Sequence, residues 1–141
     1  MTEVFTTRSP EETWQLAARL LPRFDGGAVL ALHGGLGAGK TTFIQGLAFA
    51  MGVAGPVTSP TFALLAEHPA PGRRLVHLDL YRLSSADELL DIGFLDYLAP
   101  PNVVAVEWPE RAPGVFPPGT FHITFENDAD PSCRRVTLEA P

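Results

Sequence analysis

The chain has 141 residues, 45% of them hydrophobic and 18% charged, as expected for one ordinary globular domain, residues 1–141, with its own core. A formal net charge of −6 excludes a broad basic surface that binds nucleic acid by charge alone. The single cysteine, Cys133, excludes an intrachain disulfide, and the lack of a signal pattern or a membrane-length apolar run predicts a soluble cytoplasmic protein with no membrane partner.

The first third of the chain predicts a helix followed by a buried strand. Ser9 suits the N-cap position, Pro10 suits the first helical position, and Glu12 completes a capping box. We expect this helix to end near Pro22. The run AVLAL, residues 28–32, is apolar throughout, which is typical of a short strand covered on both faces of a sheet.

A glycine-rich segment follows this strand and matches the phosphate-binding loop pattern G-x-x-x-x-G-K-[ST] at Gly34, Gly39, Lys40 and Thr41. Residues 42–51 predict a helix, so the strand, loop and helix that the motif requires occur in order. Glycines let backbone N–H groups surround phosphate oxygens at a helix N-terminus, and Thr41 offers a hydroxyl to Mg²⁺. The loop residues expected to bind nucleotide are Gly35, Leu36, Gly37, Ala38, Gly39, Lys40, Thr41 and Thr42.

Lys40 is the only lysine of the chain, and the nine other basic residues are arginines. Its compact ammonium group can bridge the outer phosphates of a nucleotide, a role that a forked guanidinium fills poorly. GTPases of this class usually read guanine through an N-K-x-D motif, which needs a further lysine. The sequence therefore predicts a preference for ATP over GTP.

The loop TSPTF, residues 58–62, lies between the predicted helix and the next strand. Many nucleotide switches place a γ-phosphate sensor at this position, and the hydroxyl groups here have the chemistry to reach a phosphate or a metal-bound water. An ordinary turn with bonds between hydroxyl and backbone groups explains the same residues equally well. Both interpretations stay open at this stage.

The remaining elements alternate between strand and helix. GPVTSPTFALLAEH ends in a short strand, GRRLVHLDLYRL predicts another, a capping box at Ser85 and Glu88 begins a helix that closes at Gly93, and residues 103–106 form a buried strand. The tail TFHITFENDADPSCRRVTLEA predicts a β-hairpin. The expected fold is α/β, a P-loop NTPase-like sheet with a parallel core flanked by helices and a C-terminal antiparallel β-hairpin.

Two acidic residues compete for the metal at such a site. Glu107 directly follows the apolar run VVAV and therefore emerges at the carboxyl edge of the sheet, where ligands of open α/β sheets bind. Asp79 lies in a strand whose alternation puts His77, Asp79 and Tyr81 on one face. We favour Glu107 as the acid that holds Mg²⁺, with Asp79 orienting the attacking water or contacting Mg²⁺ through water. His77 is expected to be a packed or hydrogen-bonded histidine.

The motifs GGLGAGKTT, SPTF, HLDLYRL, DELLDIGFLDYL and VEWPER occur in the order seen in the TsaE (YjeE) family, and in this the sequence resembles those small bacterial P-loop ATPases over nearly its whole length. The resemblance implies a part in the threonylcarbamoyladenosine (t6A) modification of tRNA. It also implies a complex with TsaB and TsaD, in which ATP hydrolysis supports turnover of the TsaD transferase and tRNA is met only through the complex.

The same resemblance implies roles for individual residues. By this resemblance Thr41 and Glu107 are the Mg²⁺ residues, and Trp108 resembles a packing residue beside the nucleotide. Together with the argument from the residues above, the expected catalytic residues are Lys40, Asp79 and Glu107. SPTF and HLDLYRL resemble two switch-like segments. For the adenine pocket the candidates are Thr7 and, in the hairpin, Arg134.

Two other functions remain in view. A small-molecule kinase on the same core needs an acceptor pocket and usually a lid that carries arginine, for which Arg73 and Arg74 are the only candidate pair. A binding module would use nucleotide occupancy as a signal with negligible hydrolysis. Turnover with and without partners separates this module from the ATPase, and phosphoryl transfer to a metabolite identifies the kinase.

Overall fold

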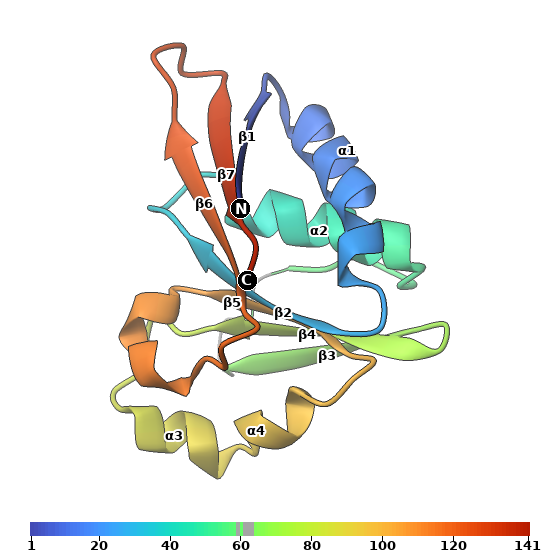
Figure 1. Ribbon diagram of the computed structural model, residues 1–141, viewed down its shortest axis with the longest axis vertical. Helices are drawn as coiled ribbons and strands as arrows, with labels where there is room; N and C mark the ends of the chain where they lie inside the picture. Colours follow the sequence, from blue (N-terminus) through green and yellow to red (C-terminus); the bar gives the residue numbers. More distant parts are fainter. Residues whose placement is uncertain (59, 61–63) are drawn as a thin grey trace.

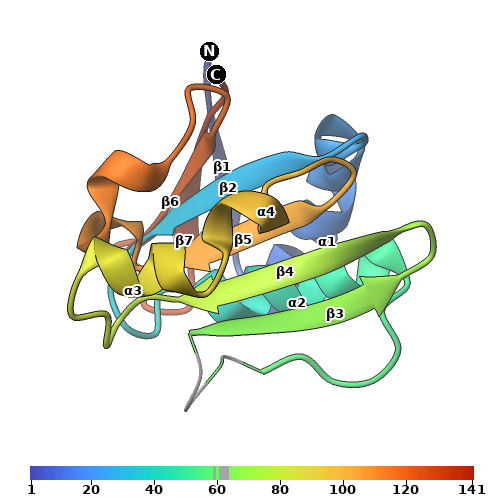
Figure 2. The same ribbon diagram turned by 90° about the horizontal axis from the view of Figure 1, so that it is seen from below.

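A computed structural model describes residues 1–58, 60 and 64–141, and within them seven strands form one sheet (Figures 1 and 2). Their order across the sheet is β1-β7-β6-β2-β5-β4-β3. The strands are β1 (Thr2–Thr7), β2 (Ala28–His33), β3 (Leu65–Ala70), β4 (Arg73–Asp79), β5 (Val103–Glu107), β6 (Phe121–Asn127) and β7 (Arg134–Glu139).

The centre of the sheet is parallel and its margins are antiparallel. Strand β2 pairs in parallel with β5 and β6, and β4 pairs in parallel with β5. The pairs β6–β7, β7–β1 and β4–β3 are antiparallel. The predicted α/β fold, with its parallel core and its C-terminal antiparallel hairpin, is therefore confirmed. Strand β1 was not predicted, because it depends on pairing with β7 at the other end of the chain.

The helices begin where the capping residues predict. The Ser9 side chain accepts the N–H of Glu12, but the Glu12 carboxylate accepts the N–H of Arg8 rather than that of Ser9, so the predicted capping box there is incomplete. The capping box at Ser85 and Glu88 is complete. The helices are α1 (Pro10–Leu20), α2 (Lys40–Met51), α3 (Ala86–Asp91) and α4 (Phe94–Tyr97), and the short 3₁₀ turns are Leu21–Phe24, Pro109–Arg111 and Pro113–Val115. Among the described residues, no helix combines the length and the apolar composition needed to cross a membrane.

The sheet separates two hydrophobic cores. Helices α1 and α2 cover one face, above the central strands in Figure 1, and α3 and α4 cover the other face. Leu75 belongs to the first core, whereas Val76 and Leu78 belong to the second, as alternation along β4 requires. All five residues of β5 are buried. This two-sided burial explains why the central strands are apolar runs without alternation.

Helices α1 and α2 touch through a glycine. A Cβ atom at Gly46 would lie 2.8 Å from the Trp14 Cα and 2.9 Å from the Trp14 carbonyl oxygen. These are backbone atoms, which cannot turn aside as the end of a side chain can. The pairing of α1 with α2, which fixes the helix that begins at the phosphate-binding loop, therefore requires Gly46.

We expect Gly46→Ala to destabilise the protein by about 1–3 kcal/mol, although alanine is the better helix former by about 1 kcal/mol, because overpacking of the helix contact dominates. Urea unfolding measures the effect. The matched control is Gly114→Ala, since its new Cβ would meet nothing within 4 Å. The control should change stability by less than about 0.5 kcal/mol. A Gly46→Ala variant as stable as the parent would contradict this account of the α1–α2 contact.

Candidate functional site

The carboxyl ends of the parallel strands open into a cavity of about 900 Å³. Its floor is formed by residues 36–42 of the phosphate-binding loop and α2. Its walls come from the start of α1, the ends of β4 and β5, and the hairpin residue Arg134. A crevice outside the carboxyl edge of a parallel sheet is the usual ligand site of this architecture.

Glycines shape the loop at this floor. Gly34, Gly37 and Gly39 have φ angles of 146°, 74° and 110°, in the region that favours glycine. At Gly34 a Cβ would also lie 2.7 Å from the Phe125 carbonyl oxygen. No described side chain caps the start of α2, so its first N–H groups face no competing side-chain acceptor. A glycine-rich loop at the N-terminus of a helix has the backbone N–H groups and the dipole that favour an anion.

The Lys40 side chain lies within this loop and is only 4% exposed. Its Nζ donates to the Gly34 carbonyl oxygen at 2.7 Å and lies 3.8 Å from the centre of the Trp108 ring, a cation–π contact. Burial lowers the pKa of Lys40 below its ordinary value, and the Glu107 carboxylate opposes that shift. The ammonium group is thus held at the cavity floor.

An aromatic wall continues from Trp108. The residue has a φ of 57°, in the left-handed region that non-glycine residues rarely adopt. Its ring lies 4.9 Å from the ring of Tyr81, and the Arg111 guanidinium lies 5.5 Å from the centre of that Tyr81 ring. Trp108 and Tyr81 both line the cavity. Trp108 therefore lies between Lys40 and Tyr81, the residue that follows the end of β4 by two positions.

The two competing acids lie opposite each other. Asp79 and Glu107 are register partners on the parallel strands β4 and β5, and both line the cavity. The Thr41 hydroxyl lies 3.2 Å from one Glu107 carboxylate oxygen and 3.4 Å from the other. Asp79 instead accepts the backbone N–H of Tyr81 at 3.0 Å. Thr41 and Glu107, predicted as a pair from residues 66 positions apart, meet directly.

The Glu107 carboxylate also contacts a buried histidine. His77 Nε2 lies 2.6 Å from Glu107 Oε2, and the His77 side chain is fully buried. A carboxylate can only accept a hydrogen bond, so Nε2 carries the proton and donates it. The expectation of a hydrogen-bonded histidine fits this contact, although its partner was not predicted.

The oxygen atoms at the cavity floor are of the kind that magnesium prefers as ligands. Among the described residues, no three His, Cys, Asp or Glu side chains gather closely enough to hold a metal by themselves. The Thr41 hydroxyl and the Glu107 and Asp79 carboxylates supply oxygen only. Mg²⁺ prefers oxygen ligands and is usually held by one or two carboxylates together with phosphates and waters, rather than by an all-protein cage.

Other predicted site residues lie at different distances from the cavity. Arg134 lines it and donates to the Gly37 carbonyl oxygen at 3.2 Å, which ties the hairpin to the loop. Thr7 is buried behind the wall, where its hydroxyl shares a 2.8 Å hydrogen bond with Thr13, and Thr13 rather than Thr7 lines the cavity. Of the TSPTF loop, Ser59, Thr61 and Phe62 lie outside the described residues.

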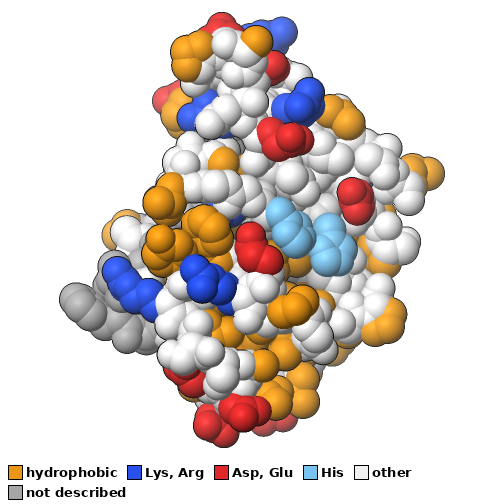
Figure 3. Space-filling model, turned by 90° about the vertical axis from the view of Figure 1, so that its left-hand side faces the viewer, with side chains coloured by type: hydrophobic (Ala, Val, Ile, Leu, Met, Phe, Trp, Pro, Cys, Tyr) orange, Lys and Arg blue, Asp and Glu red, His pale blue; other side chains and the backbone are white. Residues whose placement is uncertain are grey.

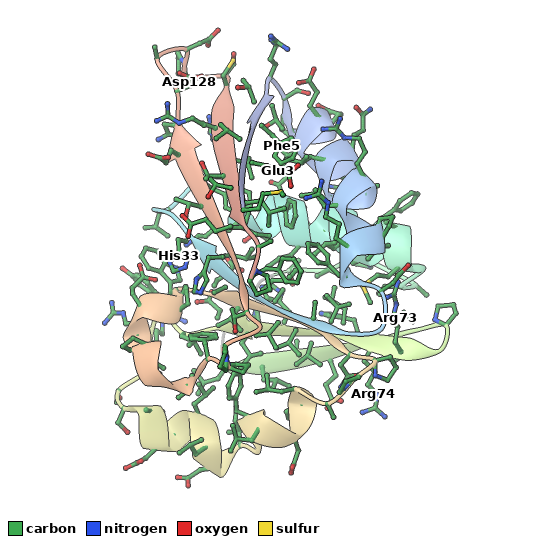
Figure 4. The ribbon with its side chains drawn as sticks, viewed as in Figure 1. Glu3, Phe5, His33, Arg73, Arg74 and Asp128 are labelled. Atoms are coloured by element: carbon green, nitrogen blue, oxygen red, sulfur yellow. The ribbon has the colours of Figure 1, made fainter. Side chains whose placement is uncertain are left out.

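The arginine pair considered as a kinase lid lies elsewhere. Arg73 and Arg74 stand at the turn between β3 and β4, at the end of these strands away from His33 (Figure 4). Arg73 pairs with Asp25 at 3.2 Å, and Arg74 pairs with Glu67 at 2.7 Å. Neither lines the cavity. Their contacts are those of surface ion pairs.

Sequence reasoning did not single out several residues that line the cavity. Arg8 and Ser9 come from the start of α1, and Tyr81 and Arg82 come from the segment after β4. The segment HLDLYRL did carry a usable signal, because its alternation places His77, Asp79 and Tyr81 on one face. No local pattern indicates that Arg8 approaches a loop that lies about thirty residues further along the chain.

A second pair of polar side chains lies beside the loop on the outer surface. His33, the last residue of β2, and His122 of β6 stand side by side (Figures 3 and 4). His33 Nε2 and His122 Nδ1 are 3.0 Å apart, whereas the ring centres are 5.2 Å apart. The rings therefore meet nitrogen to nitrogen, and one nitrogen donates a hydrogen bond that the other accepts.

Comparison with known proteins gives one consistent result. The family described as "Threonylcarbamoyl adenosine biosynthesis protein TsaE" matches residues 7–136. A TsaE protein of Treponema pallidum is 37% identical over 94% of this chain and 96% of its own length. A TsaE protein of a Nostoc species is 40% identical over 98% of this chain and 85% of its own length. Both are named tRNA threonylcarbamoyladenosine biosynthesis proteins.

A solved structure agrees with the sequence matches. The crystal structure of YdiB from Bacillus subtilis superposes with a TM-score of 0.78 at 31% identity. The superposition covers 99% of this chain and 86% of that one. The sheet and its flanking helices are therefore shared along the whole described chain.

The histidine pair predicts a pH dependence of stability. Burial, followed by the neighbouring His122, lowers the pKa of His33 below its ordinary 6.5, Lys40 adds to this shift, and Glu110 and Glu139 oppose it. The unfolded chain therefore binds this proton more readily, and the stabilising contribution of His33, complete above about pH 6.5, is lost as the pH falls.

The test is the variant His33→Gln, which keeps a donor toward His122 but cannot titrate. Free energies of unfolding measured between pH 8 and pH 5 should fall more steeply for the parent than for the variant. Parallel curves would mean that His33 does not carry this dependence.

Proposed function

The chain belongs to the TsaE family of threonylcarbamoyl adenosine biosynthesis proteins, and on that premise we propose that it is a Mg²⁺-dependent ATPase formed by one P-loop domain, residues 1–141. The family acts in the biosynthesis of t6A in tRNA. The observation that carries the proposal is the Thr41–Glu107 contact of 3.2 Å directly above the phosphate-binding loop. It brings a hydroxyl and a carboxylate to the position where a metal would meet the outer phosphates.

ATP fits the groups around the cavity. Three left-handed glycines and the start of α2 suit a chain of phosphates, and Lys40 suits the outermost of them. With Lys40 committed to phosphate, the chain has no second lysine for guanine recognition. Arg134 beside Gly37, together with the start of α1, suits the nucleoside end of the ligand.

Each polar residue has a separate role in the proposed hydrolysis. Lys40 donates hydrogen bonds to phosphate oxygens and offsets negative charge that develops there. Thr41 and Glu107 hold Mg²⁺, which when bound neutralises phosphate charge. Asp79 faces the cavity across from Glu107 and orients the attacking water or contacts the metal through water.

The partners follow from the family rather than from the cavity. We propose that the protein works in the cytoplasm with TsaB and TsaD, and that it meets tRNA only through this complex. A net charge of −6 supports indirect contact with tRNA, because the protein offers no broad basic surface to a phosphate backbone.

The two alternative functions are less well supported. A kinase lid would have to bring Arg73 or Arg74 to the cavity, yet both are paired with acids away from it. A pure binding module needs no second carboxylate, yet Asp79 lines the cavity opposite Glu107. ATP turnover measured with and without TsaB and TsaD tests the proposal, and no turnover under either condition would contradict it.

Lys40→Ala should keep the fold but weaken MgATP binding by at least about tenfold, or ~1.4 kcal/mol, because the phosphate ammonium is lost. Lys40→Arg should also fail, since a longer planar group does not fit between Gly34 and the Trp108 ring. Calorimetric titration measures the affinity and circular dichroism checks the fold. The control is Arg135→Ala, which removes a cation of β7 that does not line the cavity. Near-normal turnover by Lys40→Arg would contradict the role assigned to the ammonium.

Substitution of Glu107 should affect Mg²⁺-dependent binding, whereas substitution of Asp79 should affect turnover. Glu107→Ala should make nucleotide binding much less responsive to Mg²⁺, because the ion loses its protein carboxylate. Asp79→Ala should still bind MgATP but turn it over more slowly, an effect mainly on kcat. The measurements are Mg²⁺-dependent affinity and single-turnover hydrolysis with the partners present, after both variants are shown to be folded. The reverse pattern would exchange the two roles and leave the ATPase proposal intact.

A further inference from the structure

The His77 side chain is fully buried, and one of its two ring nitrogens is accounted for by Glu107. The other nitrogen, Nδ1, is buried without a hydrogen-bond partner among the described residues. Leaving a buried polar atom unpaired destabilises a fold by about 1–3 kcal/mol. A hydrophobic side chain at this position would avoid that loss. Because the buried Nε2 of His68 is also unpaired among the described residues, the hydrogen bond to Glu107 is the contact that sets His77 apart.

The hydrogen bond of His77 Nε2 to Glu107 suggests why a histidine occupies this position. His77 Nε2 lies 2.6 Å from Glu107 Oε2, while Thr41 Oγ1 lies nearer to the other oxygen, Oε1, at 3.2 Å than to Oε2 at 3.4 Å. The imidazole thus holds one carboxylate oxygen, Oε2, while the Thr41 hydroxyl contacts both oxygens and lies slightly nearer to Oε1. Rotation of the carboxylate would break this short hydrogen bond. The carboxylate therefore keeps the orientation in which its oxygens lie 3.2 and 3.4 Å from the Thr41 hydroxyl.

The position of His77 in the sheet gives it this reach. It lies two residues before Asp79 on β4 and pairs in register with Ala105, two residues before Glu107 on β5. Its side chain and those of Asp79 and Glu107 therefore project from the same face of neighbouring parallel strands. A hydrogen bond from β4 to Glu107 also ties together the two strands that carry the proposed metal acid and its neighbour.

We propose that His77 is a positioning residue that orients the Glu107 carboxylate toward the metal position beside Thr41. This rests on the proposed function, since it assumes that Glu107 holds Mg²⁺. His77 touches neither nucleotide nor metal and acts through Glu107 alone. Loss of such a supporting partner typically weakens metal affinity or activity by about ten- to hundredfold.

The test compares two substitutions of nearly equal shape. His77→Gln places an amide N–H where the Nε2–H was, and His77→Met fills the same space without a donor. His68→Met is the matched control, because His68 lies on the neighbouring strand β3 and its buried Nε2 also has no hydrogen-bond partner among the described residues. The probe is a non-hydrolysable ATP analogue titrated into each full-length variant at several MgCl₂ concentrations.

We expect His77→Met to reduce the Mg²⁺-dependent gain in affinity by about tenfold or more, and His77→Gln to restore most of it. Binding without Mg²⁺ should be the same in all variants, which a general loosening of the fold would not allow. His68→Met should behave as the parent. In a Glu107→Ala background, His77→Met should have no further effect, because the group through which it acts is gone. Should His77→Met not fold, His77→Asn replaces it, since its amide is too short to reach Glu107.

The outcomes separate this inference from the function on which it rests. Equal Mg²⁺ responses of the parent and the folded His77→Met protein would overturn the role of His77 and leave the ATPase proposal standing. A loss that His77→Gln does not restore would overturn it as well, in favour of a packing role. A parent protein whose nucleotide affinity ignores Mg²⁺ would overturn both, because a positioning residue needs a metal site on which to act.

Discussion

The parallel register of β2, β5 and β4 is the constraint on which the site depends. It carries three chain segments to one edge of the sheet, so that the loop after β2 meets Glu107 at the end of β5 and Asp79 at the end of β4. A shift of one residue in β5 would turn Glu107 to the other face, into the core covered by α3 and α4. That shift is opposed by Glu107 itself, because its carboxylate would lose Thr41 and His77 and be buried among apolar side chains.

A buried carboxylate at this edge requires hydrogen-bond donors, and they come from two elements. Glu107 is 4% exposed, and its oxygens accept from Thr41 on α2 and from His77 on β4. The position of α2 in turn depends on the close approach of α1 at Gly46. The helix contact at Gly46 therefore supports the polar contact in the cavity, because Thr41 reaches Glu107 only when α2 is correctly placed.

Patterns that are local in the chain could be predicted from the sequence, and contacts between distant segments could not. The glycine-rich loop between a strand and a helix, the buried strand before Glu107 and the capping box at Ser85 each lie within a few residues, and all three occur in the structure. The parallel core and the hairpin followed from the order of such elements. Helix α4 was missed, because Gly93, read as a stop, adopts a φ of 83° and a new helix begins directly after it. Arg134 meets Gly37 across 97 positions through the pairing of the hairpin, which no local pattern contains.

The contacts of Lys40 explain why the ammonium suits this floor better than any other cation. An ammonium has three N–H donors, and among the described residues Gly34 O is the one acceptor it bonds, at 2.7 Å. The Trp108 ring adds attraction without accepting a conventional hydrogen bond, since the cation lies over its face at 3.8 Å. In the proposed function, the two other N–H groups are the ones that would meet phosphate oxygens while the side chain stays anchored. A guanidinium spreads its five donors over a rigid plane and could not meet one carbonyl, one ring face and a phosphate from the same buried point.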